Sequence, residues 1–279
     1  MQGILPQPGF ALALQCLAAL LYAMLSMHFW RRYWAAPPAA AADHSGHLLQ
    51  FAALSVHAAA VFGSILAGDT LRIGVGDAIS AILWLTVLIY GAGGLFYPLQ
   101  ALQALVMPLA AVAVLLPALL PAAKIIPNTE LPAFRLHLAM SMLAYSLFTI
   151  ASLHVLLMAM LERRLHRGVL AGVLHRLPPL LTMETLLFRI ICAGFITLTL
   201  TLASGIVFSE EVFGRAAHLN HKTLFGFISW SVFGALLAGR RWRGWRGRTA
   251  VRWTLAGFLL LILAYLGSKF VLEVLLGRV

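Results

Sequence analysis

The stretch that decides the fold is Arg240–Arg248, with the sequence RRWRGWRGR, which lies between two long apolar runs at residues 220–239 and 251–276. Six of the chain's 20 Lys and Arg residues fall between Arg240 and Arg252. A basic cluster flanked by apolar segments indicates a cytoplasmic loop of a membrane protein, because Lys and Arg resist translocation across the bilayer. The stretch therefore predicts two membrane-spanning helices and the side of the membrane on which they meet.

The composition is that of a polytopic membrane protein. Of the 279 residues, 62% are hydrophobic and only 10% are charged, whereas a soluble domain carries about 25% charged residues. The formal net charge of +11 would suit nucleic-acid binding, but the basic residues cluster beside apolar runs, where membrane anchoring places them. The cysteines Cys16 and Cys192 form no CxxC or CxxCH motif, so we predict neither a thiol-redox pair nor covalent haem attachment. Met1–Gly9 carries no positive charge, which favours a retained first helix over a cleaved signal peptide.

Eight apolar runs are long enough for helices that cross a bilayer, which takes roughly 20 residues. The sequence therefore predicts an all-α fold with about eight transmembrane helices. Several Gly and Pro residues interrupt the third and fourth runs, which predicts either a tight hairpin or broken helices there. The eight runs lie at residues 10–30, 48–67, 78–96, 100–121, 134–161, 185–208, 220–239 and 251–276.

The distribution of basic residues predicts the orientation of these helices. With the N-terminus outside, thirteen Lys and Arg residues lie on the cytoplasmic side and seven on the outer side. The reverse orientation would invert this bias, and cytoplasmic loops normally carry the excess of Lys and Arg. We therefore expect both termini on the outer, periplasmic side.

Three of the ten histidines are candidate ligands. His57 lies in the middle of the second run, where an ionisable side chain is costly unless it faces a partner. His137 lies one turn inside the outer end of the fifth run, and His221 opens the seventh run on the same side. If these two helices are neighbours, His137 and His221 could face each other, and two imidazoles in that arrangement can ligate a haem iron. The alternative is that both histidines are interfacial and bond to backbone or water.

Other polar residues give weaker signals. Ser141, Tyr145 and Thr149 form a stripe below His137, which we interpret mainly as helix packing, although Tyr145 could also touch a ligand. Among the acidic residues, only Glu273 is expected in or near a span. No HExxH, GxSxG or phosphate-binding loop is present. The sequence therefore favours a binding or handling protein over a catalyst, and no catalytic residue is assigned.

Several motifs occur together in the second half of the chain, and their combination is specific although each one alone is weak. They are His137-Leu-Ala-Met-Ser141 running on to Ala144-Tyr145, Gly205-Ile-Val-Phe208, His221-Lys222-Thr223 with Trp230, Gly244-Trp-Arg-Gly-Arg248, Ala256-Gly257-Phe258 and Ala264-Tyr265-Leu266-Gly267-Ser268. With these motifs the chain resembles the cytochrome c assembly family, the CcsA- and CcmC-like membrane haem-handling proteins, and in particular its YpjD-like branch. The similarity covers 130–279 well and the four helices of 1–121 more loosely, so we expect a single transmembrane domain over 1–279.

The resemblance implies a multi-pass protein of the bacterial inner membrane that binds or delivers non-covalent haem b. In the family, a histidine that opens the helix holding the tyrosine is an outward-facing haem ligand, and His137 occupies that place. The chain lacks the family's tryptophan-rich segment, and 269–279 contain no second outward histidine. His221 or His57 is then expected to serve as the second ligand. The implied partners are membrane lipid and other cytochrome c maturation proteins, with no nucleic acid.

Three functions remain open at this point. The first is a haem-binding membrane protein associated with cytochrome c assembly. The second is a transporter accessory subunit on the same scaffold without a haem site, which the intramembrane His57 and the Pro-containing runs would suit. The third is a structural subunit of a larger membrane assembly, with no ligand of its own.

Overall fold

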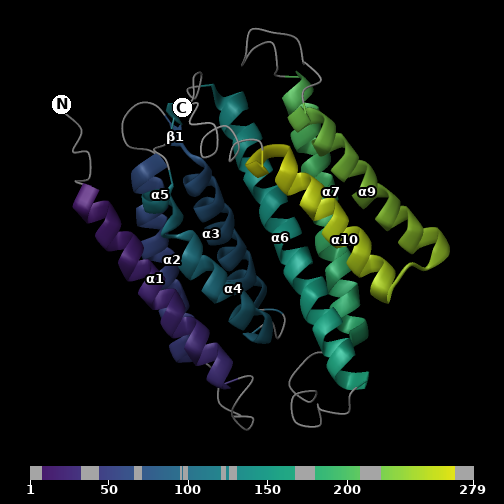
Figure 1. Ribbon diagram of the computed structural model, residues 1–279, viewed down its shortest axis with the longest axis horizontal. Helices are drawn as coiled ribbons and strands as arrows, with labels where there is room; N and C mark the ends of the chain where they lie inside the picture. Colours follow the sequence, from purple (N-terminus) through teal and green to yellow (C-terminus); the bar gives the residue numbers. More distant parts are fainter. Residues whose placement is uncertain are drawn as a thin grey trace. The chain divides into compact units, whose positions relative to one another are not determined.

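A computed structural model of the chain describes residues 8–32, 44–65, 71–94, 96, 100–120, 124–125, 131–166, 180–207 and 221–267. The described elements form two compact units, with the division between Pro127 and Asn128 (Figure 1). Among the described residues, eight helices are long and apolar enough to cross a membrane, which confirms the predicted number and order of spans.

The first unit is a ring of four long helices. Helix α1 packs against both α2 and α4, and α3 packs against the same two helices, so that each long helix has two neighbours. The sequential neighbours are joined by short connections, as expected for consecutive transmembrane helices. The helices are α1 (Pro8–Trp30), α2 (His44–Ile65), α3 (Val75–Gly94), α4 (Gln100–Ala113) and the short α5 (Leu116–Leu119).

The fourth span is broken, as the prolines in its sequence predicted. Helix α4 ends at Ala113, a turn follows, and α5 resumes with Pro117 in its first turn, where a missing N–H costs nothing. The broken end lies against α3 at Gly76, where an added Cβ would be 2.7 Å from the carbonyl oxygen of Leu116. Glycine is therefore required at this close approach of two backbones.

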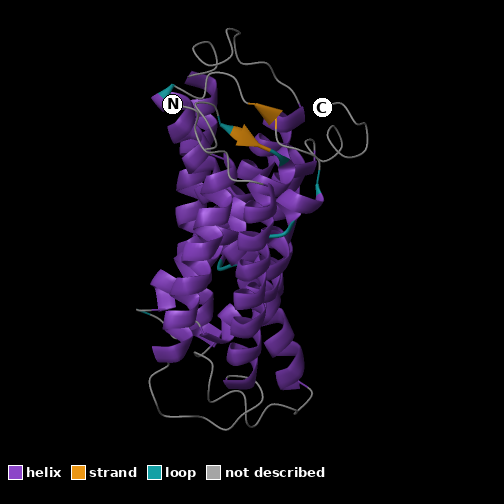
Figure 2. Cartoon of the chain, turned by 90° about the vertical axis from the view of Figure 1, so that its left-hand side faces the viewer, coloured by secondary structure: helices purple, strands orange, loops and turns teal. Residues whose placement is uncertain are grey.

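A two-stranded antiparallel ribbon, which the sequence analysis did not predict, joins two connections of the first unit. Strand β1 (Arg72–Ile73) pairs with β2 (Lys124–Ile125). Figure 2 shows the ribbon at one end of the helices. It ties the connection before α3 to the segment after α5, and every other element in the described part of the chain is a helix.

The second unit contains four long helices and a terminal π-helical turn. Helix α6 packs along α7 and α10, and α9 packs against α10 and α7. The elements are α6 (Pro132–His166), α7 (Leu180–Val207), α9 (His221–Arg243), α10 (Gly247–Ile262) and the π-helix η3 (Leu263–Gly267).

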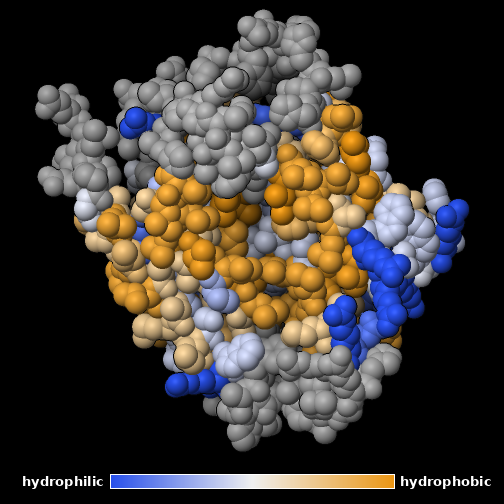
Figure 3. Space-filling model, viewed as in Figure 1, coloured by the Kyte–Doolittle hydropathy of each residue, from blue (hydrophilic) through white to orange (hydrophobic). Residues whose placement is uncertain are grey.

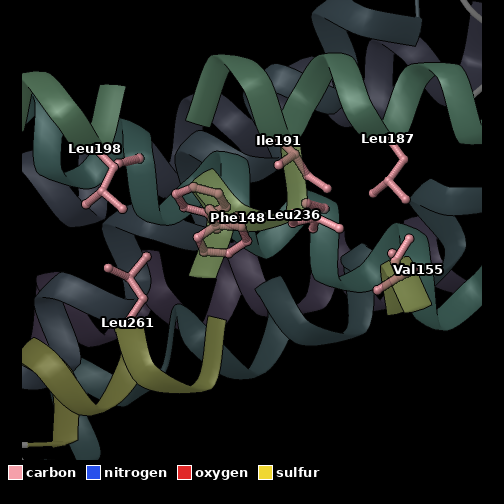
Figure 4. Close-up of a cluster of buried hydrophobic side chains, with 11 residues drawn as sticks. Phe148, Val155, Leu187, Ile191, Leu198, Leu236 and Leu261 are labelled. Carbon is pink, nitrogen blue, oxygen red and sulfur yellow. The ribbon is translucent and has the colours of Figure 1, made fainter. Parts of the chain in front are cut away.

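The centre of the second unit is an apolar cluster built around two stacked rings (Figure 4). The rings of Phe148 on α6 and Phe233 on α9 are nearly parallel, with centroids 3.8 Å apart. Two glycines make room for them: an added Cβ would be 3.1 Å from the Phe148 ring at Gly194 and 2.9 Å from the Phe233 ring at Gly257. Close packing of this kind holds membrane helices together, because lipid tails are as apolar as the helices themselves.

The turn between α9 and α10 is shaped by the stretch that opened the sequence analysis. Gly244 and Gly247 have φ angles of 65° and 52°, a region that residues with a Cβ rarely adopt. Trp245 donates its backbone N–H to the carbonyl of Gly239 at 3.2 Å, and its ring lies over Gly239, which leaves no space for a side chain there. The turn therefore has a defined structure, and Arg246 within it bonds through Nε to Glu184 on α7.

Candidate functional site

His137 is the best-placed candidate ligand, at one end of the second unit. It lies in the second turn of α6, and its Nδ1 is 2.9 Å from Oγ of Ser204, near the end of α7. The Ser204 hydroxyl in turn lies 2.9 Å from the carbonyl oxygen of Thr201. A serine has one hydroxyl hydrogen. Both contacts are satisfied together when Ser204 donates this hydrogen to Thr201 and accepts from Nδ1–H of His137.

This arrangement corresponds to the Nδ1–H tautomer of His137. With the proton on Nδ1, the neutral imidazole carries its lone pair on Nε2, which is the form in which histidine coordinates a metal. A hydrogen bond from the second ring nitrogen to a fixed acceptor is the usual way in which proteins orient a metal-binding histidine. His137 is partly exposed, so its ring is held on one side and accessible on the other.

Gly205 completes the support of the imidazole. A Cβ at this position would be 3.3 Å from Cε1 of His137. The absence of a side chain lets the ring lie directly against α7 beside Ser204. The glycine of the Gly205-Ile-Val-Phe208 motif therefore has a physical role in placing the histidine.

The polar stripe on α6 is mostly engaged in packing, as predicted. Ser141 donates to the carbonyl of His137 at 2.7 Å and Thr149 donates to that of Tyr145 at 2.8 Å, so both stay within their own helix. The hydroxyl of Tyr145 donates to the carbonyl of Leu261 at 2.7 Å, at the point where α10 passes into η3. Tyr145, predicted as a ligand contact, therefore links α6 to α10 through its polar atom.

The π-helical turn brings a cation and an aromatic ring to the same end of the unit. Nζ of Lys222, at the start of α9, lies 5.9 Å from the ring centroid of Tyr265 in η3, within the range of a cation–π contact. π-helical turns are rare and occur frequently at functional sites. The end of the second unit that holds His137 thus also carries the positive charge of Lys222 on α9, beside Tyr265 in η3.

The predicted approach of His221 to His137 lies outside what the structure describes. His221 is the first residue of α9, but its side chain is not among those described. The most extensive contacts of α6 are with α7 and α10 rather than with α9. Within the described residues, α6 and α9 meet through the Phe148–Phe233 stack.

His57 is in the first unit, where it is fully buried and bonded on both sides. Its Nδ1 lies 3.1 Å from the hydroxyl of Tyr22 on α1, and its Nε2 lies 2.9 Å from that of Ser80 on α3. The histidine therefore links three helices of the ring. Because both ring nitrogens are already engaged, coordination of a metal would require breaking one of these hydrogen bonds.

His154 lies on the same helix as His137, 17 residues further along α6. Its Nε2 donates to the carbonyl of Met183 on α7 at 2.9 Å. Among the described residues, no three His, Cys, Asp or Glu side chains gather as a metal site would require. A haem ligated by one or two histidines does not need such a cluster.

An acidic residue that the sequence analysis missed lies at the opposite end of the second unit. The expectation that only Glu273 lies in or near a span is wrong, because Glu184 is in the second turn of α7 and is 7% exposed. Its Oε1 accepts from Nη1 of Arg240 at 2.7 Å and from Nε of Arg246 at 2.9 Å. Glu273 itself lies outside the described residues.

The signal for this ion pair was present in the sequence. Arg240 and Arg246 belong to the basic stretch that predicted a cytoplasmic loop. The predicted topology puts the start of the run at 185–208 on the same side, so a carboxylate there is a natural partner for them. The predicted boundary of that span, at residue 185, excluded Glu184 by one position. The helix begins five residues earlier, at Leu180.

Comparison with known proteins places the chain in a family. The family model described as cytochrome C assembly protein matches residues 45–276, and the chain therefore belongs to this family, which confirms the resemblance. Together with the eight apolar helices, this makes it an all-α polytopic membrane protein. No solved structure matches the chain.

Three relatives illustrate the similarity. Inner membrane protein YpjD of Escherichia coli K12 is 34% identical over 140 residues, which are 50% of this chain and 52% of the relative. An uncharacterised 28.8 kDa protein of Azospirillum brasilense is 37% identical over 142 residues, 51% of this chain and 52% of the relative. Cytochrome c biogenesis protein CcsA of Prochlorococcus marinus is 39% identical over 88 residues, 32% of this chain and 28% of the relative. The chain spans about half the length, or less, of these curated relatives.

Proposed function

We propose that this protein binds haem non-covalently in the bacterial inner membrane and acts in the assembly of c-type cytochromes, with His137 as an axial ligand. The relatives named for the inner membrane and for cytochrome c biogenesis support the setting. The protein is a binding and handling protein in this proposal, and covalent attachment of haem occurs elsewhere.

The observation that carries the proposal is the hydrogen-bond chain from His137 through Ser204 to Thr201. The two distances of 2.9 Å suit a chain in which His137 donates from Nδ1 to Ser204 and Ser204 donates to Thr201, which supports the Nδ1–H tautomer. The donor that haem iron requires, a neutral imidazole nitrogen with a lone pair, is then Nε2 of His137. The residues present therefore fit one axial ligand of a haem.

Two further features suit a haem at this end of the second unit. Haem supplies an iron centre that an imidazole nitrogen can ligate. It also carries two propionate groups, which are anionic. Lys222 carries a positive charge at the start of α9, where it can pair with an anionic group. Gly205 leaves room for the imidazole against α7, because a Cβ there would be 3.3 Å from Cε1 of His137.

The second axial ligand in this proposal is His221, which opens α9 on the end of the unit that holds His137. His57 is a poorer candidate, because both of its ring nitrogens are hydrogen-bonded to Tyr22 and Ser80. The bias of Lys and Arg toward one side of the spans predicts that both termini, and with them the His137 end of the second unit, lie on the periplasmic side.

The test is an absorption spectrum of the detergent-purified protein, oxidised and dithionite-reduced, with a pyridine haemochrome assay after hemin has been supplied. We expect stoichiometric haem in the wild type, loss of haem in His137→Ala and retention of haem in His57→Gln. The glutamine variant keeps polar atoms for Tyr22 and Ser80 but removes the imidazole, so it separates ligation from packing.

Two results would contradict the proposal. Equal haem content in the wild type and His137→Ala would remove His137 as a ligand. A wild type without haem, even with hemin supplied, would favour the transporter-accessory or structural alternative on the same scaffold.

A further inference from the structure

We propose that the second unit binds one anionic phospholipid at the end opposite His137, with an acyl chain in a cavity between α6, α7 and α10 and the phosphate on Arg246. This site is independent of the haem proposal. It is built from three features of the described residues: an apolar cavity, a neutralised carboxylate in its wall, and an arginine with unused donors beside it.

The cavity has the shape and lining of a site for a hydrocarbon chain. Its volume is about 240 Å³, and most of its wall is aliphatic, with Met158 from α6, Leu187 from α7 and Val251 from α10. Leu180 and Leu181 line it as well and are exposed, so the cavity opens between apolar side chains. A typical pocket for a drug-sized ligand starts at roughly 300 Å³, so this cavity suits a segment of an acyl chain better than a wide planar molecule.

Glu184, one of the two carboxylates in the cavity wall, is already paired with two arginines. Glu184 lines the cavity, and Arg240 and Arg246 hold its Oε1 at 2.7 and 2.9 Å. The guanidinium of Arg240 also lies over the ring of Phe188, 4.7 Å from its centroid, which fixes it in place. Two arginines on Glu184 leave this group of three side chains with one net positive charge, while a second carboxylate, Glu162, lies elsewhere in the wall.

Arg246 is the residue that can bind a phosphate there. Only its Nε is engaged, with the two oxygens of Glu184 at 2.9 and 3.2 Å, and its side chain is 54% exposed. A guanidinium has five N–H donors, so its two terminal nitrogens keep donors directed to solvent or lipid. Arginine binds phosphate through such paired donors.

The surroundings favour an anion over a neutral or cationic headgroup. Gly247, which lines the cavity, is the first residue of α10, and a helix N-terminus attracts negative charge. Figure 3 shows hydrophilic side chains gathered over the α9–α10 turn, where Arg241, Arg243 and Arg248 are all exposed. Glu162 also lines the cavity and opposes an anion, but the arginines outnumber the two carboxylates. Charge complementarity therefore selects an anionic phospholipid.

The experiment is native mass spectrometry of the detergent-purified full chain with equal amounts of phosphatidylglycerol and phosphatidylcholine. We expect one phosphatidylglycerol to be retained in preference to phosphatidylcholine. Arg246→Gln should lower this preference about fivefold, because one basic contact to an anionic lipid is worth about 1 kcal/mol. Arg31→Gln, an exposed arginine at the end of α1 in the first unit, is the matched control and should leave the preference unchanged.

A second variant tests the cavity without touching the ion pair. Ala159, partly exposed, lines the cavity on α6, and Ala159→Phe should fill it and abolish retention of either lipid while Arg246 and Glu184 stay in place. Equal retention of the two lipids by the wild type would overturn the proposal. Unchanged phosphatidylglycerol binding in both Arg246→Gln and Ala159→Phe would overturn it as well.

Discussion

The two units place histidine differently, and the contrast shows what makes a buried histidine available for chemistry. His57, in the middle of the first unit, is fully buried, and both of its ring nitrogens are bonded to hydroxyls on other helices. His137, near the end of the second unit, is partly exposed and is bonded through Nδ1 to Ser204. The deeper histidine is thus a structural link, and the shallower one keeps a nitrogen for a ligand. The number of partners, more than depth in the membrane, distinguishes the two roles.

Both units bury polar side chains that join neighbouring helices. In the first unit, Gln50 on α2 donates to the carbonyl of Val87 on α3, and Gln103 on α4 donates to that of Tyr90 on α3. The second unit has the apolar cluster of Figure 4 at its centre. Its His154 and Ser229 are also buried, and each bonds to a backbone carbonyl of another helix.

The largest effect is expected from breaking the ion pair at the end of the second unit. Glu184→Ala leaves Arg240 and Arg246 without their shared carboxylate and should lower the free energy of unfolding by about 3 kcal/mol, since an unpaired, partly buried charge is costly. The midpoint of thermal unfolding in detergent measures this. If the variant unfolds at the wild-type temperature, the pair does not hold α7 to the α9–α10 turn.

The next effect concerns packing at the centre of the second unit. Gly257→Ala places a Cβ 2.9 Å from the Phe233 ring, and such overpacking should cost about 1–3 kcal/mol. Gly63→Ala on α2 is the matched control, because no atom lies within 4 Å of its added Cβ. There alanine should be neutral or stabilise the helix, as it has the higher helix propensity. Equal unfolding temperatures for the two variants would contradict the close packing described for α10.

A third prediction tests whether Ser204 orients the His137 ring, apart from any effect on the stability of the protein. Ser204→Ala removes the acceptor that orients His137 and should weaken hemin binding about 10- to 100-fold, the usual cost of losing such a partner. Ser229→Ala is the matched control, because its hydroxyl donates to the carbonyl of Gly257 at 2.8 Å, away from the histidine. A hemin titration of both variants should show weakening in Ser204→Ala alone. Equal affinities would mean that Ser204 does not position the ring.

The smallest effect on stability is expected from removing a single hydrogen bond in the first unit. Tyr22→Phe removes the hydroxyl that bonds His57 and should cost about 0.6–1 kcal/mol, typical of one hydrogen bond between membrane helices. The hydroxyl of Tyr90 is buried and has no partner among the described residues, so Tyr90→Phe should be neutral or stabilising. Unfolding midpoints that place the two variants in the opposite order would show that the polar contacts of the ring are misassigned.

Much of the architecture could be predicted from the sequence, because it depends on the lengths of the apolar runs. Each of the eight spans, and the break near Pro117 in the fourth, follows from runs of apolar residues and their prolines. The two-residue ribbon of β1 and β2 could not be predicted, since four residues carry no strand pattern. The boundary of α7 was misplaced because polar residues of its first two turns, among them Glu184, interrupt the apolar run.

The candidate site was predictable in its residues but not in its chemistry. The position of His137 at a helix opening was visible in the sequence, and so was the depth of His57. Their partners come from helices 67 and 35 residues distant along the chain, which no local pattern links to them. The tautomer of His137 depends on Ser204 and Thr201, so only the packing of α6 on α7 reveals which nitrogen is available.

The most direct test of the account is chemical rescue at His137. His137→Gly removes the proposed axial ligand and leaves space at the ring's position beside Ser204 and Gly205. We predict that the purified variant loses its haem absorption after hemin is supplied and regains it when free imidazole is added, while imidazole leaves the wild type unchanged. A variant that retains wild-type haem content without imidazole would contradict the central claim that His137 ligates the iron.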